Sequence, residues 1–214
     1  MQKSIFLLIS LLSSLCFAAN VALIDQYDGA TYGGGFFHTA LSNRNLEHDV
    51  FGSHPDGQST QTLYDNLLNY NLIIFGSNAG KDGNITSTVS NSSNQSALNT
   101  WLSNGGNIFM NVYNDGGGGI NFLNLPGLSF SNQDNSGTSY TLVNDDPIFN
   151  APHDVVSEIL TIKSWEKLVT FPTAATEKTI HIENGGYISA ASFKWGEGRV
   201  FFWGQPIDTN HSSW

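Results

Sequence analysis

Basic residues are scarce in this chain. Only 8 of its 214 residues are lysine or arginine, against 18 aspartates and glutamates, so the formal net charge at pH 7 is −10. Proteins that bind nucleic acid neutralise its phosphates with clusters of lysine and arginine. The composition therefore predicts no nucleic-acid partner.

Cysteine is nearly absent, because the single one, Cys16, lies in an N-terminal apolar segment. Residues 1–18 combine Lys3, an apolar run and small residues before Ala18, which is the layout of a secretory signal peptide. The run is shorter than the ~20 residues that a membrane-spanning helix needs. We predict cleavage after Ala18, a secreted or periplasmic protein without membrane attachment, and a single domain over residues 19–214. Without cysteine, that domain has no disulfide, zinc–thiolate site or cysteine nucleophile.

The first half of the domain alternates apolar runs with segments of helical spacing. Runs that are apolar on both faces are typical of buried parallel strands, and residues 21–24 form such a run. Further strands are predicted at 48–51, 72–77 and 107–112. Residues 78–96, rich in Asn, Ser, Thr and Gly, are predicted to form a long surface loop. From residue 139 the β-like segments are short and are separated by glycine turns, as at 184–186 and 195–198.

These patterns predict an α/β fold. We expect a flavodoxin-like, doubly wound, mostly parallel sheet with helices on both faces and a β-rich C-terminal extension of the same sheet.

Several segments carry a resemblance to a known family. They are LIIFGSNAG at 72–80, GGNIFM at 105–110, DPIF at 146–149 and GEGRVFFWG at 196–204. Together they resemble the class I glutamine amidotransferase-like superfamily, nearest its trehalose-utilisation (ThuA-like) branch. The resemblance implies the amidotransferase-like fold over about 21–208 and, by analogy, a link to sugar metabolism.

The residues that match the family's catalytic positions have lost the catalytic chemistry. Catalytic members of the superfamily carry a cysteine nucleophile on the turn after the fourth strand, and a His-Pro-Glu motif follows the last strand. Here the turn reads Asn-Val-Tyr-Asn-Asp at 111–115, and after the last strand Gln205 stands in place of the histidine while Pro206 is retained. Acyl transfer needs a nucleophile and a base within hydrogen-bond reach. The sequence therefore predicts no glutamine hydrolysis and favours a protein without enzymatic activity.

Polar residues follow the predicted strands at their carboxyl ends, where open α/β sheets bind ligands. Amides, carboxylates and an aromatic hydroxyl have the hydrogen-bonding capacity that a neutral sugar or polyol needs. The predicted ligand-binding residues are Asp25, Gln26, Asp28, Ser77, Asn78, Asn111, Tyr113, Asn114, Asp115, Gln205, Asp208 and His211. Asn and Asp also stabilise loops by bonding their own backbone, so a purely structural role stays open for each.

We predict that the domain binds a small polar ligand, such as a carbohydrate, without a cofactor. Two alternatives remain: a carbohydrate-active hydrolase or isomerase that uses Asp25 and Asp208, or an interaction module of a secreted assembly that makes its contact through 78–96. The six histidines show no H-x-H or HExxH spacing, so no metal site is predicted. A site assembled from distant residues such as Asp25, His54 and Asp208 is left open, as is the oligomeric state.

Overall fold

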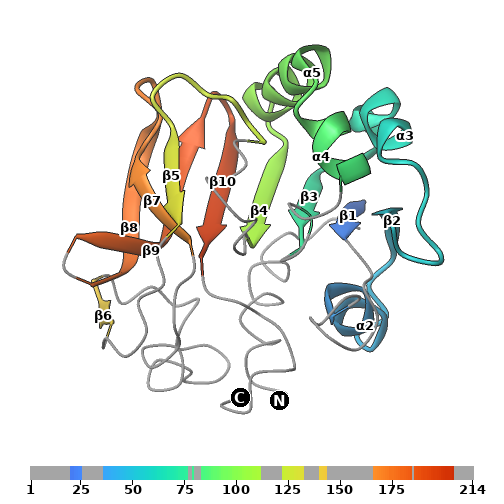
Figure 1. The fold of residues 1–214 in the computed structure, drawn as a ribbon, viewed down its shortest axis with the longest axis horizontal. Coiled ribbons are helices and arrows are strands. Elements are labelled where there is room, and N and C mark those ends of the chain that lie inside the picture. The colour runs from blue at the N-terminus through green and yellow to red at the C-terminus, as the bar shows by residue number, and fades with distance from the viewer. Residues whose placement is uncertain are drawn as a thin grey trace.

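The computed structural model describes residues 20–25, 36–76, 79, 83–111, 122–132, 140–143, 166–184 and 186–204. Their strands form one ten-stranded sheet in the order β2-β1-β3-β4-β10-β9-β7-β5, with β8 paired to β9 and β6 to β8. Figure 1 shows the sheet with its helices gathered beside β1–β4.

Five strands of the sheet run parallel to one another. They are β1 (Val21–Asp25), β2 (His48–Gly52), β3 (Leu72–Phe75), β4 (Asn107–Asn111) and β10 (Gly198–Trp203). Every residue of β1 and β3 is buried, which explains why these strands are apolar without alternation. The four strands predicted in the first half of the domain are confirmed as β1–β4.

The other five strands are joined by antiparallel ladders. They are β5 (Ser129–Asn132), β6 (Thr141–Leu142), β7 (Glu166–Thr170), β8 (Thr176–Asn184) and β9 (Tyr187–Trp195). Five ladders of the described sheet are antiparallel and four are parallel, so the prediction of a mostly parallel, flavodoxin-like sheet is wrong. The turns at 184–186 and 195–198 are the physical reason. A parallel connection needs a crossover of a dozen or more residues, whereas a turn of two or three residues can only make a hairpin.

The described helices lie on the two faces of the parallel part. Helix α2 (Phe36–Ser42) packs through Phe37 and Leu41 on the face that contains Val21 and Leu23. The opposite face is covered by a second group: α3 (Thr60–Asp65), the short 3-10 helix η2 (Leu67–Asn69), α4 (Gly83–Val89) and α5 (Ser92–Ser103). In the described part of the chain no helix covers β5–β9 (Figure 1), so the helices flank only the parallel strands of a mixed sheet, and the predicted helix-flanked, mostly parallel sheet is wrong.

The segment predicted as a loop at 78–96 contains α4 and the start of α5. Ile85 and Val89 are fully buried and lie one helical turn apart, which gives α4 an apolar face. Asn91 caps α5, because its side-chain oxygen accepts the backbone N–H of Ser93 and of Asn94. The Asn- and Ser-rich composition that indicated a loop therefore supplies a helix cap instead.

The helices that the structure describes are all too short or too polar to cross a bilayer. The predicted signal peptide, residues 1–18, lies outside the described residues. Its cleavage, and the secreted or periplasmic location that follows from it, stay predictions.

Candidate functional site

Residues at the carboxyl ends of three neighbouring parallel strands form a row across the sheet. Ile24 of β1 pairs with Phe75 of β3, and β3 continues this register into β4. The residues that follow are therefore neighbours in the order Asp25, Gly76, Asn111. We call these three residues the edge row.

The edge row lies where the order of the strands reverses. From β1 the chain reaches β2 on one side and then returns to β3 on the other side. The helices follow the same division, because α2 lies on one face of the sheet and α3–α5 lie on the other. Ligands of open α/β sheets bind beyond the carboxyl ends of the strands at such a switch point. Asp25 and Gly76 stand on either side of it.

Asp25 is a buried carboxylate positioned by a glycine. Its exposed fraction is 3%. A Cβ atom added at Gly76 would lie 2.6 Å from its Oδ1 atom, so the carboxylate occupies the space that a side chain at 76 would fill. The backbone N–H of Gly76 donates to the carbonyl of Ile24 at 2.8 Å, which keeps the two strand ends together. The row thus holds its carboxylate against the neighbouring strand.

Asn111 joins two strands through its side-chain amide. Its Nδ2 group donates to the carbonyl oxygen of Trp203 on β10 at 3.1 Å, and the residue is completely buried. Side chains alternate between the faces of a strand, so Asn111 lies on the same face as Phe109, and Asp25 lies on the same face as Leu23. Both apolar residues belong to one core cluster. The carboxylate and the amide are therefore on one face, about 10 Å apart at two strand spacings.

Asp25 and Asn111 are the two predicted site residues that the structure describes. The others lie outside the described residues: Gln26, Asp28, Ser77, Asn78, Tyr113, Asn114, Asp115, Gln205, Asp208 and His211. In the sequence, each strand of the edge row is followed within three residues by members of this set.

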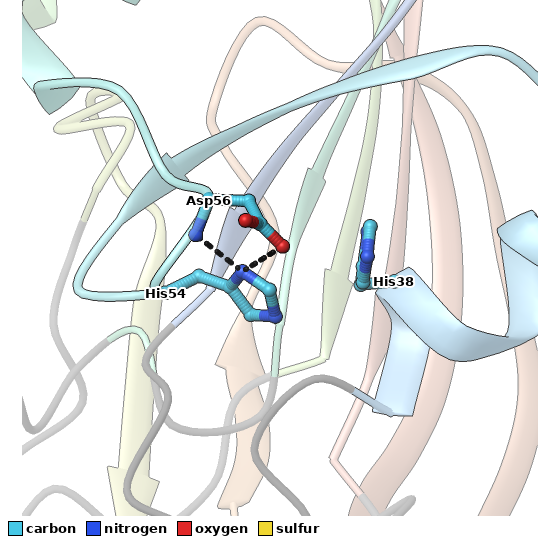
Figure 2. A group of neighbouring side chains, drawn as sticks. All are labelled: His38, His54 and Asp56. Atoms are coloured by element: carbon cyan, nitrogen blue, oxygen red, sulfur yellow. Dashed lines mark hydrogen bonds and ion pairs between the residues drawn. The ribbon is translucent and has the colours of Figure 1, made fainter.

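A second group of polar side chains, which the sequence did not predict, lies beside β2. It contains His38 on α2 together with His54 and Asp56 in the loop after β2, and Figure 2 shows the three side chains facing one another. One possible ligand atom from each lies within 4.8 Å of those of the other two. We call His38, His54 and Asp56 the histidine cluster.

One hydrogen bond holds His54 beside Asp56 (Figure 2). The backbone N–H of Asp56 donates to Nδ1 of His54 at 3.1 Å, and Oδ2 of Asp56 lies 3.8 Å from the same nitrogen. The side chain of His54 is 8% exposed, whereas that of Asp56 is 76% exposed. The imidazole of His54 is therefore largely shielded from solvent, whereas the carboxylate of Asp56 is exposed.

His48, at the start of β2, sets the tautomer of His38. A carbonyl can only accept, so the contact of 2.8 Å between Nδ1 of His48 and the Leu46 oxygen places a proton on that nitrogen. In the neutral ring, Nε2 of His48 is then the acceptor for Nδ1 of His38, which lies 2.8 Å away. The chain of hydrogen bonds leaves the lone pair of His38 on Nε2.

The surroundings of His38 favour its neutral form. Partial burial lowers the pKa of His38 below the usual value of 6.5, and the nearby His48 and His54 lower this pKa further. The carboxylate of Asp56 acts in the opposite direction but has the smallest effect. A neutral imidazole with a lone pair on Nε2 is the form that binds metals or accepts a proton.

The histidine cluster escaped the sequence analysis because its members are separated by 16 and 2 residues without a repeating motif. One signal was available: a helix between β1 and β2 has to pack on that pair, so a histidine on it can meet the loop after β2. The described part of the chain also has two surface grooves along α5, of about 430 and 930 Å³. Neither is lined by a residue of the edge row or of the histidine cluster.

Comparisons with known proteins give information on the fold and none on the chemistry. No protein-family model matches the chain, and no curated protein matches it. Among solved structures, the chain is similar to the cytoplasmic protein STM1381 from Salmonella typhimurium LT2, with a TM-score of 0.53 and 11% identity over 90% of this chain and 89% of that one. At this identity the likeness shows a shared fold alone.

Two further solved structures are similar at lower scores. The cytoplasmic protein STM3548 from Salmonella typhimurium has a TM-score of 0.49 and 11% identity, over 90% of this chain and 91% of that one. The beta-galactosidase from Bacillus circulans sp. alkalophilus has a TM-score of 0.48 and 13% identity, and 88% of this chain covers 29% of that enzyme.

Proposed function

We propose that the protein binds a small polar ligand, with carbohydrate as the favoured class, at the carboxyl edge of its parallel strands. The observation that carries the proposal is the edge row, in which a buried carboxylate and a buried amide share one face at the switch point of the strand order. Polar residues are uncommon in the interior of an otherwise apolar face. An apolar face that retains two of them at this position is typical of a binding floor.

Two features of the sequence support a neutral sugar or polyol as the ligand. The residues within three positions after the strands of the edge row, such as Gln26, Ser77 and Asn114, add amide and hydroxyl groups that both donate and accept hydrogen bonds. The resemblance to the trehalose-utilisation branch points to the same class of ligand. The segment at 111–115 lacks cysteine and serine, which favours binding over acyl transfer.

Gly76→Ala is expected to weaken ligand affinity at least tenfold. The added Cβ would lie 2.6 Å from Oδ1 of Asp25 and 3.2 Å from the carbonyl oxygen of Ile24, so it would displace the carboxylate. The measurement is calorimetric titration with a panel of mono- and disaccharides, with thermal unfolding recorded for each variant. Gly83→Ala is the matched control, because its Cβ would meet nothing within 4 Å.

Asp25→Asn provides a second test that keeps the shape of the side chain. Loss of affinity in a folded Asp25→Asn variant would support the edge row even if Gly76→Ala failed to fold. The proposal is overturned if no saccharide of the panel binds, or if both variants bind as tightly as the unmodified protein.

The buried carboxylate of Asp25 also favours one alternative, a carbohydrate-active hydrolase or isomerase that uses Asp25 together with Asp208. The same variants separate the two functions. A bound sugar that is turned over by the unmodified protein, and that Asp25→Asn binds with unchanged affinity but no longer converts, would favour the enzyme.

A further inference from the structure

We propose that His38, His54 and Asp56 form a binding site for a divalent transition-metal ion of the zinc class, a site separate from the edge row. The proposal rests on the geometry of three side chains that come from two different elements, α2 and the loop after β2. It does not depend on the identity of the polar ligand proposed above.

The spacing of the possible ligand atoms is close to that of a metal site. Ligand atoms about 2.1 Å from a tetrahedral ion lie about 3.4 Å from one another. In the histidine cluster all three atoms lie within 4.8 Å of one another, and Nδ1 of His54 lies 3.8 Å from Oδ2 of Asp56. Closing the cluster around an ion therefore needs movements of up to about 1.4 Å, shared between the exposed side chain of Asp56 and the two imidazoles.

The protonation of His38 is the second observation that favours a metal. Imidazoles that bind metals generally donate their other N–H to a neighbouring acceptor, which fixes the ring and its tautomer. Nδ1 of His38 has this partner in His48, whose own Nδ1 donates to the carbonyl of Leu46. The lone pair of His38 is thereby fixed on Nε2, where it can bind a metal ion. His48 is a positioning residue for the His38 ring.

His54 is also in a form that can coordinate. Its Nδ1 atom accepts the backbone N–H of Asp56, so this nitrogen carries no proton. A metal ion bound through Nδ1 would replace that hydrogen bond on the side of the ring where the Asp56 carboxylate lies. Deprotonated donors are what metal binding requires.

The donor set selects the class of ion. Two imidazole nitrogens and one carboxylate oxygen suit zinc and the neighbouring first-row divalent ions, whereas calcium and magnesium prefer oxygen donors alone. Three protein ligands leave a fourth position for water or another ligand. Because Asp56 is largely exposed, the ion would exchange with solution rather than be permanently enclosed.

Calorimetric titration of the purified, tag-free protein with ZnCl₂, after treatment with a chelator and desalting, tests the proposal. We expect one zinc ion per chain, and an affinity that falls at least tenfold in each of His38→Ala, His54→Ala and Asp56→Asn. Asp49→Asn is the matched control, because Asp49 lies on β2, its carboxylate accepts a hydrogen bond from Tyr70, and its replacement changes the charge equally. Its affinity should stay within twofold of that of the unmodified protein.

Replacing zinc with Co²⁺ reports on the number and type of ligands around the ion. The visible absorption of bound cobalt should be that of a four- or five-coordinate nitrogen and oxygen site, and it should disappear in His54→Ala. Circular dichroism of each variant without metal shows that the protein remains folded. The proposal is overturned if zinc does not bind saturably, or if any of the three substitutions leaves the affinity within twofold of the unmodified protein.

Because the saccharide and zinc experiments change different residues, their failures can be distinguished. If the protein binds a sugar but not zinc, the proposed metal site alone is overturned. If it binds zinc but no sugar, the proposed ligand site at the edge row alone is overturned.

Discussion

Gly198→Ala is expected to lower the free energy of unfolding by about 3 kcal/mol or more. A Cβ at this position would lie 2.1 Å from the carbonyl oxygen of Leu102 and 2.2 Å from that of Gly106. Both atoms belong to the backbone, so no rotation of a side chain can relieve the overlap. Helix α5 or the loop after it would have to move away from β10. Chemical denaturation measures the change.

The control for this substitution is again Gly83→Ala, where the added methyl group meets nothing within 4 Å. Because Gly83 opens α4, alanine there should leave stability unchanged or raise it slightly. A loss below about 1 kcal/mol in Gly198→Ala would mean that α5 does not pack against the start of β10 as described.

Phe202→Ala is expected to cost about 3–5 kcal/mol, the range for a large aromatic removed from a core. Phe202 is completely buried on β10, where its backbone pairs with Met110 on one side and Ala191 on the other. Its ring centroid lies 5.1 Å from that of Phe130 on β5. The side chain therefore packs where the parallel and antiparallel parts of the sheet meet.

Thermal and chemical unfolding of Phe202→Ala check this expectation, and Val169→Ala on β7 is the comparison. Val169 is 49% exposed, so its truncation should change stability by less than about 0.5 kcal/mol. Two separate unfolding transitions in the Phe202→Ala variant would indicate that β10 joins two independently stable parts. Equal small losses in both variants would contradict the burial of Phe202.

The parallel strands could be predicted because burial on both faces of a strand requires a continuous apolar run. The run Val21 to Ile24 is apolar without alternation, and only a strand covered on both sides needs that composition. The direction of the later strands was harder to predict. Their turns at 184–186 and 195–198 did indicate hairpins, but β5 and β7 pair over a long separation in sequence that no local pattern reveals.

Helix α5 shows why composition misled at 78–96. Asn91 and Ser92 are frequent in loops for the same reason that makes Asn91 a good helix cap: a short polar side chain can bond a nearby backbone N–H. In the preceding segment, the burial of Ile85 and Val89 is what distinguishes the helix α4 from a loop. In the sequence, these two apolar residues were too few to outweigh their polar neighbours.

Of the two candidate sites, the edge row could be predicted from the sequence and the histidine cluster could not. Asp25 and Asn111 could be predicted as neighbours, because the carboxyl ends of parallel strands meet at one edge whatever the details of packing. The meeting of His38 with His54 depends on how far α2 is rotated about its axis, and Phe37 and Leu41 fix that rotation by packing on the sheet. No spacing rule along the chain contains this information.

The two proposed sites lie at neighbouring strands. Gly52, the last residue of β2, pairs with Asp25, and His54 follows only two residues later. A metal ion in the histidine cluster would therefore lie near the same edge of the sheet as the edge row.

A map of backbone amide shifts during titration with the saccharide panel tests the central claim most directly. In the ¹⁵N-labelled protein, the account predicts that a bound sugar shifts the amides of Asp25, Gly76 and Asn111, and that those of β5–β9 keep their positions. Shifts confined to the antiparallel strands or to the grooves along α5, or no shifts with any sugar, would contradict it.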